Sequence, residues 1–161
     1  MSIKPTKVST PHPWHGLEEN SQDLELDAFI TVLMSRASKN LRRTITEPYA
    51  SKYGLSVFEW RTMAVLGRGR ILKFSDVVNE VADDKGQVSR VLKQLSDRGL
   101  VATTPLGENW RQGMQCSLTH EGEKIYKKIM PEARKAQSDV ILSLPKSQRL
   151  AFFRILKRLQ P

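Results

Sequence analysis

The stretch from residue 54 to residue 120 constrains the fold most, because three short helical patterns are followed there by two alternating strands. Gly54 is a helix stop signal, and Ser56 and Glu59 then have the spacing of a capping box, in which each side chain satisfies a backbone N–H of the other residue. A largely buried helix is therefore predicted from this point to about Leu66.

Two further helices are predicted in this stretch, one over residues 74–82 and one from Asp84 to Gly99. Asp84 is a favourable N-cap with Gln87 three residues later, and Gly99 supplies the C-terminal stop. The last of these helices is amphipathic, so it can anchor to a core on one side and present polar groups on the other. Its apolar face consists of Val88, Val91, Leu92 and Leu95.

A two-stranded hairpin is predicted to follow these helices. Residues 100–104 have the pattern of a strand, residues 105–109 are rich in turn formers, and the apolar side chains of residues 114–118 alternate with polar ones. Three short helices and a hairpin are the layout of a winged helix-turn-helix domain. The expected fold class is therefore mainly α with a small β-hairpin wing, and the expected domain is 54–120.

Helical patterns flank this domain on both sides. Residues 23–53 carry apolar side chains at three- and four-residue steps, with a kink or break expected at Pro48. Residues 121–161 are predicted to form a long helix and a closing one, separated at Pro145. These apolar series are more extensive than a lone small domain needs, so 23–53 and 121–161 are predicted to form a helical dimerisation layer in a homodimer. Residues 1–22, rich in proline and small polar residues, are predicted to be an N-terminal arm.

The polar face of the third helix carries hydrogen-bond donors. In the major groove of DNA, which is about 12 Å wide, arginine pairs with guanine and glutamine with adenine, whereas lysine and serine suit phosphates. These donors predict binding to double-stranded DNA, although many solvated surface helices have a similar composition. The candidate DNA-binding residues on this helix are Lys85, Gln87, Ser89, Arg90, Lys93 and Gln94.

Three motifs resemble those of the MarR family, the multiple-antibiotic-resistance-type transcriptional regulators. The run D-K-G-Q-V-S-R at 84–90, continued by L-S-D-R-G-L-V at 95–101, is similar to the family's recognition-helix motif. L-T-H-E-G at 118–122 matches the L-T-x-x-G signature between the wing and the long helix. Gly54-Leu55-Ser56, followed by Trp60 and Leu66, is similar to the start of the family's second helix, and the resemblance spans about residues 24–160.

The resemblance implies a homodimeric winged helix-turn-helix repressor that binds a pseudo-palindromic operator and is released by a small-molecule effector. Arg111 corresponds to the wing-tip arginine, which enters a narrow minor groove because of its negative potential. Trp110 stands directly before this arginine, where the family usually has aspartate, so Arg111 is expected to be positioned differently. Ala82 stands where the family commonly has glycine, which is expected to alter the turn before the recognition helix. The positions that correspond to DNA-facing residues of the recognition helix are Lys85, Gln87, Ser89 and Arg90.

An effector site is predicted where the first helical segment meets the second. Phe29 and Leu33 are followed at the same helical spacing by cationic and amide side chains, so an apolar stripe becomes a polar one. A guanidinium at the edge of an apolar pocket can bind a carboxylate through two hydrogen bonds, and the resemblance implies a small effector that is often an aromatic acid. The alternative is that these arginines pair with acidic neighbours or contact DNA. The candidate effector residues are Arg36, Asn40, Arg43, Trp60 and Met63.

The charge of the chain favours a polyanionic partner without specifying one. Its 26 Lys and Arg against 17 Asp and Glu give a net charge of +9, which suits nucleic acid but also an anionic membrane surface. The excess is uneven, because residues 121–161 hold ten basic and four acidic residues and residues 54–120 hold nine and seven. Part of the C-terminal charge is therefore expected only to solvate the long helices.

Other classes of function find little support. A single cysteine and three scattered histidines give neither a disulfide within the chain nor a metal site, and no nucleophile–base pair or phosphate-binding loop is present, so no enzyme activity and no cofactor are predicted. Cys116 is interpreted as a structural thiol rather than a redox sensor. No apolar run approaches the roughly 20 residues that cross a bilayer, so no membrane association and a cytoplasmic location are expected. The remaining alternative is a winged-helix interaction module that does not bind DNA.

Overall fold

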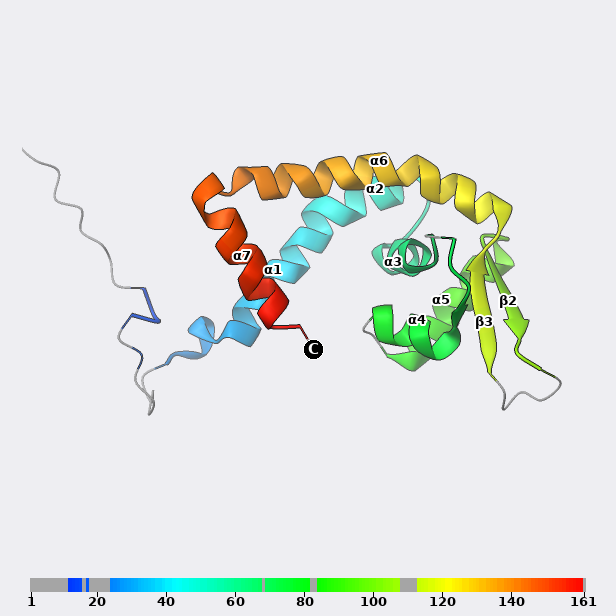
Figure 1. Cartoon of the computed structure of the whole chain (residues 1–161), viewed down its shortest axis with the longest axis horizontal. Coiled ribbons are helices and arrows are strands. Elements are labelled where there is room, and N and C mark those ends of the chain that lie inside the picture. Colours follow the sequence, from blue (N-terminus) through cyan, green and yellow to red (C-terminus); the bar gives the residue numbers. More distant parts are fainter. Residues whose placement is uncertain are drawn as a thin grey trace, which may run out of the picture. The chain divides into compact units, whose positions relative to one another are not determined.

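The computed structural model describes residues 12–15, 17, 24–67, 69–81, 84–107 and 113–160. These residues are mainly helical with one small antiparallel sheet, so the expected fold class is confirmed (Figure 1). The chain divides into a first compact unit that ends at Leu41 and a second unit that begins at Arg42, and each is described by itself. Among the described residues, no helix is both long enough and apolar enough to cross a bilayer.

The first unit contains a short 3-10 turn, Leu26–Ala28, and the helix α1, Ile30–Leu41. The continuous helix expected from residue 23 is interrupted at Phe29, whose backbone is extended. Trp14 contributes to this arrangement, because its indole N–H donates to the Ala28 carbonyl at 2.8 Å and takes an acceptor that a continuous helix would use for its own backbone.

The second unit begins with a π-helical turn, Arg42–Thr46, that leads into the short helix α2, Glu47–Ser51. The sequence predicts a kink or break near Pro48, but the backbone stays helical from Arg42 to Ser51. The π-helical turn just before α2 accommodates the proline, which has no N–H to donate and whose ring clashes with the carbonyl four residues earlier. A π-helical turn widens the backbone at this point. The segment ends at Gly54, whose φ of 66° is a conformation that glycine adopts without strain.

Three short helices follow: α3 over Val57–Leu66, α4 over Phe74–Val81 and α5 over Lys85–Asp97. The predicted capping box is present at the start of α3, because the Ser56 hydroxyl accepts from the Glu59 N–H at 3.2 Å and the Glu59 carboxylate accepts from the Ser56 N–H at 2.8 Å. The local signals that predicted these helices therefore also set their starting points.

The sheet has three antiparallel strands in the order β1-β3-β2. The hairpin strands are β2, Val101–Pro105, and β3, Met114–Leu118, which agrees with the predicted wing to within one residue. The third strand, β1, is Leu72–Lys73, and the sequence analysis missed it because two residues are too few to show alternation. Leu72 pairs with Cys116, so β1 attaches the segment before α4 to the wing.

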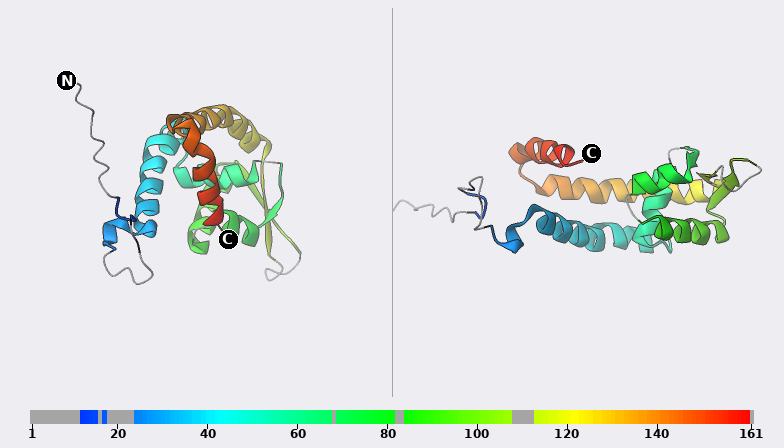
Figure 2. Two further views of the ribbon diagram at one scale, coloured as in Figure 1. Left: turned by 60° about the vertical axis from the view of Figure 1, so that its left-hand side comes forward. Right: turned by 90° about the horizontal axis from the view of Figure 1, so that it is seen from below.

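The C-terminal part consists of two helices, α6 over His120–Ser143 and α7 over Lys146–Arg158. α6 is one long helix that continues through Pro131 (Figures 1 and 2). The predicted break falls between α6 and α7, where Leu144 is extended and precedes proline. The core of the second unit combines apolar residues of α2 to α6 and of the sheet. Its most buried members are Met63, Leu66, Val77, Val88, Leu92, Leu95, Cys116 and Ile129.

Candidate nucleic-acid interface

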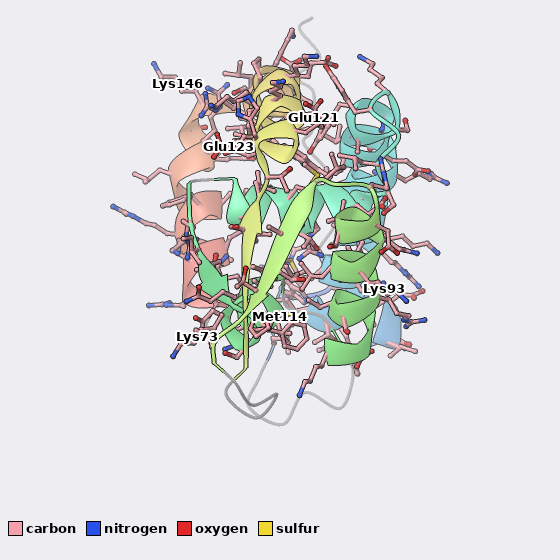
Figure 3. All side chains as sticks on the ribbon, turned by 90° about the vertical axis from the view of Figure 1, so that its right-hand side faces the viewer. Lys73, Lys93, Met114, Glu121, Glu123 and Lys146 are labelled. Atoms are coloured by element: carbon pink, nitrogen blue, oxygen red, sulfur yellow. The ribbon has the colours of Figure 1, made fainter. Side chains whose placement is uncertain are left out.

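Helix α5 has one buried apolar face and one exposed polar face, as the sequence predicts. The four apolar side chains of the buried face are at most 6% exposed and belong to the core. All six predicted DNA-binding residues of this helix lie on its solvent-exposed surface, and Lys93 lies on the side of α5 that faces away from the sheet (Figure 3). These exposed residues are Lys85, Gln87, Ser89, Arg90, Lys93 and Gln94.

The first turn of α5 is ordered by local contacts. The Asp84 carboxylate accepts from the Gln87 N–H at 3.1 Å, which confirms the predicted N-cap. The Lys85 ammonium lies 6.0 Å from the centre of the Phe74 ring, at the outer limit of a cation–π contact with α4. Arg90 Nε lies 3.4 Å from the Gly86 carbonyl, so its stem follows the helix surface towards the N-terminus. The guanidinium remains exposed and can reach a ligand.

The end of α5 contacts α3. Arg98, the C-cap of α5, donates from Nη1 to Glu59 Oε1 at 2.9 Å, and the two residues lie 39 positions apart in the sequence. The sequence analysis placed Glu59 in the capping box and Arg98 in the family motif, but nothing in the linear pattern connects the two. Gly99 follows with a φ of 68° and ends the helix as predicted.

The junction between the wing and α6 is built on the L-T-H-E-G run. Thr119 donates from Oγ1 to the Gly99 carbonyl at 2.6 Å and from its backbone N–H to the Leu100 carbonyl at 3.1 Å. Its hydroxyl also caps α6 by accepting from the Gly122 N–H at 3.0 Å. A Cβ on Gly122 would lie 2.0 Å from the Leu100 oxygen, so only glycine permits this approach of α6 to the residues that follow α5.

The described part of the wing is the β2–β3 ladder, which runs from the Val101–Leu118 pair to the Pro105–Met114 pair. Beyond it, the Leu106 N–H donates to the Gly113 carbonyl at 3.0 Å. The predicted wing-tip arginine, Arg111, lies outside the described residues, as do Trp110 and Ala82.

Comparison with known proteins identifies the fold. No protein-family model and no curated protein matches the chain. Among solved structures, a mutant of E. coli MarR complexed with operator DNA is 17% identical, with a TM-score of 0.73 over 85% of this chain and 99% of that one. BpsR of Bordetella bronchiseptica, whose DNA binding is regulated by 6-hydroxynicotinic acid, is 20% identical, with a TM-score of 0.72 over 84% and 95%. A MarR-family protein of Mycobacterium tuberculosis is 25% identical, with a TM-score of 0.59 over 83% and 95%.

The chain has the MarR-family fold. The resemblance seen in the sequence motifs and the likeness of the three-dimensional structures thus agree. The order α3, α4, α5, β2 and β3 is the order of helices and hairpin that the sequence analysis expects of a winged helix-turn-helix.

The predicted effector residues fall on both units of the MarR fold. Arg36 and Asn40 lie on α1, and Arg36 donates to Asp27 at 2.8 Å in an exposed ion pair, which is the alternative that the sequence left open for this arginine. Arg43 is exposed in the π-helical turn of the second unit. Trp60 and Met63 are buried in the core of that unit, at 4% and 0% exposure.

Trp60 is the centre of an aromatic cluster that the sequence analysis did not find. Its indole N–H donates to the Tyr49 hydroxyl at 3.1 Å, and the two rings are perpendicular. On its other side Trp60 stacks on Tyr126 of α6, with the ring centres 6.0 Å apart. Gly67 makes room for this stack, because a Cβ there would lie 2.3 Å from the Tyr126 ring. The cluster joins α2, α3 and α6 at positions too far apart in the sequence to form a pattern.

A cavity of about 540 Å³ lies between residues 44–52 and α6. This volume is in the range of small-molecule sites, although none of the predicted effector residues is among those that line it. At its edge Glu132 accepts from the Lys52 ammonium at 2.7 Å and from the Tyr53 hydroxyl at 2.8 Å. These two hydrogen bonds lower the pKa of the Glu132 carboxyl, and the bond to Glu132 raises the pKa of Lys52.

Cys116 lies fully buried on β3. Burial raises the pKa of its thiol, because the thiolate would lose its hydration. A neutral, enclosed thiol reacts poorly with oxidants, which supports the interpretation of Cys116 as a structural residue.

Proposed function

We propose that this chain is a sequence-specific, double-stranded DNA-binding transcriptional regulator that acts as a homodimer. The observation that carries the proposal is the exposed face of α5, where six hydrogen-bond donors stand opposite a face anchored in the core of a MarR fold. A two-fold dimer places its recognition helices in successive major grooves, about 34 Å apart, so the operator is a pseudo-palindrome. Regulation is favoured over catalysis because similar structures are described as regulators.

The exposed residues of α5 have different roles in this proposal. Arg90 and Gln87 contact base edges, because guanidinium and amide groups form the paired hydrogen bonds that distinguish guanine and adenine. Lys85 and Ser89 contact phosphates and fix the register of the protein on the duplex. Lys93 and Gln94 extend the contact along the helix, and Arg111 enters the flanking minor groove.

The test begins with duplexes enriched from a random pool by the wild-type protein. Arg90→Ala should weaken binding to the enriched duplex by about 1–3 kcal/mol per subunit and relax the preference at particular positions. Lys85→Ala should weaken binding to enriched and random duplexes about equally and reduce the salt dependence, because fewer counterions are released. Fluorescence anisotropy at two salt concentrations measures both effects. An Arg90→Ala protein that binds as tightly and selectively as wild type would show that the recognition helix is assigned wrongly.

Exposed apolar side chains in both units support the homodimer. In the first unit, Phe29, Ile30, Leu33 and Met34 are 40–45% exposed, and α1 has no buried residue. In the second unit, α7 also has no buried residue. Large apolar side chains that are exposed along one helix in this way mark an interaction site in a globular protein. The exposed large apolar residues of α7 are Leu150, Phe152, Phe153 and Ile155, and Leu159 follows directly after the helix.

We also propose an aromatic acid as the effector, with Arg36 binding its carboxylate. BpsR, whose DNA binding 6-hydroxynicotinic acid regulates, supports the ligand class. An aromatic carboxylate should then raise the melting temperature, because it binds the folded protein. It should also weaken DNA binding, because it binds more tightly to a dimer whose two α5 helices are not spaced for successive major grooves than to one whose helices are. Arg36→Ala should abolish this response and leave DNA binding without ligand unchanged. Loss of DNA binding in this variant would instead make Arg36 a structural or phosphate-contacting residue.

The alternative function is a winged-helix module that binds another macromolecule instead of DNA. It predicts that the wild-type protein enriches no duplex sequence and that its affinity for random DNA disappears at physiological salt. The exposed donors of α5 favour DNA, because a protein-binding face is usually depleted of lysine.

A further inference from the structure

An ion pair joins the last turn of α5 to the first turn of α3. It consists of the Arg98 guanidinium and the Glu59 carboxylate, at 2.9 Å between Nη1 and Oε1. The Glu59 side chain is only 11% exposed, whereas that of Arg98 is 39% exposed. A carboxylate so largely withdrawn from water depends on partners within the protein.

Both oxygens of the Glu59 carboxylate have a fixed partner. Oε2 accepts from the Ser56 N–H at 2.8 Å in the capping box, and Oε1 accepts from Arg98. The cap therefore holds the carboxylate in one orientation, which gives the ion pair a defined direction.

The helix dipoles favour the same arrangement. Glu59 is the third residue of α3, next to the partial positive charge of its N-terminus. Arg98 is the C-cap of α5, next to the partial negative charge of its C-terminus. The pair thus connects two helix ends, each of which stabilises the charge that lies there.

The C-terminal end of α5 is its anchored end. Next to Arg98, the Gly99 carbonyl accepts from the Thr119 hydroxyl, so successive residues are held by α3 and by the start of α6. The buried face of α5 is apolar, and apolar packing has no preferred direction. Gln87 lies eleven residues before Arg98, or about 16 Å along the helix. A tilt of about 5° at Arg98 would then move Gln87 by roughly 1.4 Å, which breaks a hydrogen bond to a base.

We propose that the Glu59–Arg98 ion pair positions the recognition helix and thereby sets its sequence preference. This inference rests on the proposed function. It adds two residues that influence DNA binding without contacting DNA. Binding to any duplex through phosphate contacts tolerates a small tilt of α5, because phosphates are contacted through point charges. Base-edge contacts do not tolerate it, because their geometry is fixed.

The experiment uses Glu59→Gln, Arg98→Gln and the double variant. Glutamine at residue 59 keeps an acceptor for the capping box, so α3 retains its start. Lys127→Gln is the matched control, because it removes an exposed ion pair with Glu123 within α6. Binding to the enriched duplex and to a random duplex of the same length is measured at two salt concentrations. Hydrogen exchange of the α5 amides is measured without DNA.

Each single variant is expected to lose preference for the enriched over the random duplex by roughly three- to tenfold. The double variant should lose no more than either single variant, because both remove the same interaction. Random-duplex affinity and its salt dependence should stay at the wild-type level, as should every property of Lys127→Gln. The α5 amides should exchange faster in the Glu59 and Arg98 variants than in wild type.

Three results would overturn the proposal. If Arg98→Gln weakens random-duplex binding and flattens its salt dependence while Glu59→Gln does not, Arg98 contacts phosphate directly. If the variants melt at lower temperature but keep the wild-type preference, the pair only stabilises the fold. If the wild-type protein prefers no sequence, the proposed function fails, and unchanged exchange of α5 in the variants would then reject the positioning role independently.

Discussion

Gly122 lies where the first turn of α6 meets the backbone after α5, and the structure leaves no space there for a side chain. A Cβ at Gly122 would lie 2.0 Å from the Leu100 carbonyl oxygen and 3.0 Å from its carbonyl carbon. Cβ atoms essentially never approach other atoms below 3.0 Å, so α6 and the Leu100 backbone would have to separate by at least about 1 Å, the difference between 3.0 and 2.0 Å. Gly122→Ala should therefore destabilise the protein strongly.

The size of the effect follows from the contacts at this junction. The Leu100 oxygen also accepts from the Thr119 N–H at 3.1 Å, and the Thr119 hydroxyl donates to Gly99 at 2.6 Å, so a separation weakens both hydrogen bonds. Overpacking costs about 1–3 kcal/mol, and a weakened hydrogen bond costs about 1 kcal/mol. The free energy of unfolding should fall by about 2–4 kcal/mol, which corresponds to a melting temperature lower by about 4–16 °C for a chain of this length.

Thermal unfolding followed by circular dichroism at one fixed protein concentration measures the shift, because the stability of a dimer depends on concentration. Gly86→Ala is the matched control. Gly86 is also helical but exposed, and its added Cβ would meet only the Asp84 carboxylate, at 3.1 Å, which needs to shift by only a few tenths of an ångström and can keep its hydrogen bond to the Gln87 N–H. Alanine is the better helix former, so this control should melt at or above the wild-type temperature. A Gly122→Ala protein within about 2 °C of wild type would refute the steric argument.

Three further predictions concern assembly, the effector and pH. Phe153→Asp should place a charge in the apolar face of α7 and give a monomer in sedimentation; a stable dimer would exclude α7 from the interface. Asp27→Asn should release Arg36 and raise the affinity for 6-hydroxynicotinic acid by roughly two- to fivefold in calorimetry, whereas unchanged affinity would argue against Arg36. Because hydrogen bonding lowers the pKa of Glu132 below its ordinary 4.5, its contribution to stability is present at neutral pH and is lost as the pH falls through the lowered value. The melting temperatures of wild type and Glu132→Gln should therefore converge in acid, and a constant difference would contradict the pairing with Lys52.

Elements with local signals could be predicted from the sequence. The capping box at Ser56, the N-cap at Asp84 and the stop at Gly99 each depend on residues within one helical turn, and all three are present as predicted. The polar face of α5 is equally local, because a helix of known start and period determines which side chains share a face. The donors of the candidate site were therefore found without a structure.

Contacts between distant residues could not be predicted in this way. The pairing of Leu72 with Cys116 creates a strand of two residues, and only the partner strand makes it recognisable. The stacking of Trp60 on Tyr126 joins helices whose approach depends on the whole core. Trp60 was assigned to an effector pocket because of its position in the sequence, and the structure places it in the core of the second unit.

Two of the sequence motifs, at 95–101 and 118–122, form one structural junction. Arg98 is held by α3, and Gly99 and Leu100 are held by Thr119, so three consecutive residues transmit the position of α5 to two other helices. Each motif therefore depends on the other, because residue 122 must be glycine only when the Leu100 carbonyl lies where a Cβ of residue 122 would be. Substitutions in the two motifs should consequently combine non-additively, as expected of residues that share hydrogen-bond partners. Because the same junction joins α6 to the end of α5, a movement of α6 should reach α5 through these directional contacts as well as through the apolar core that the two helices share.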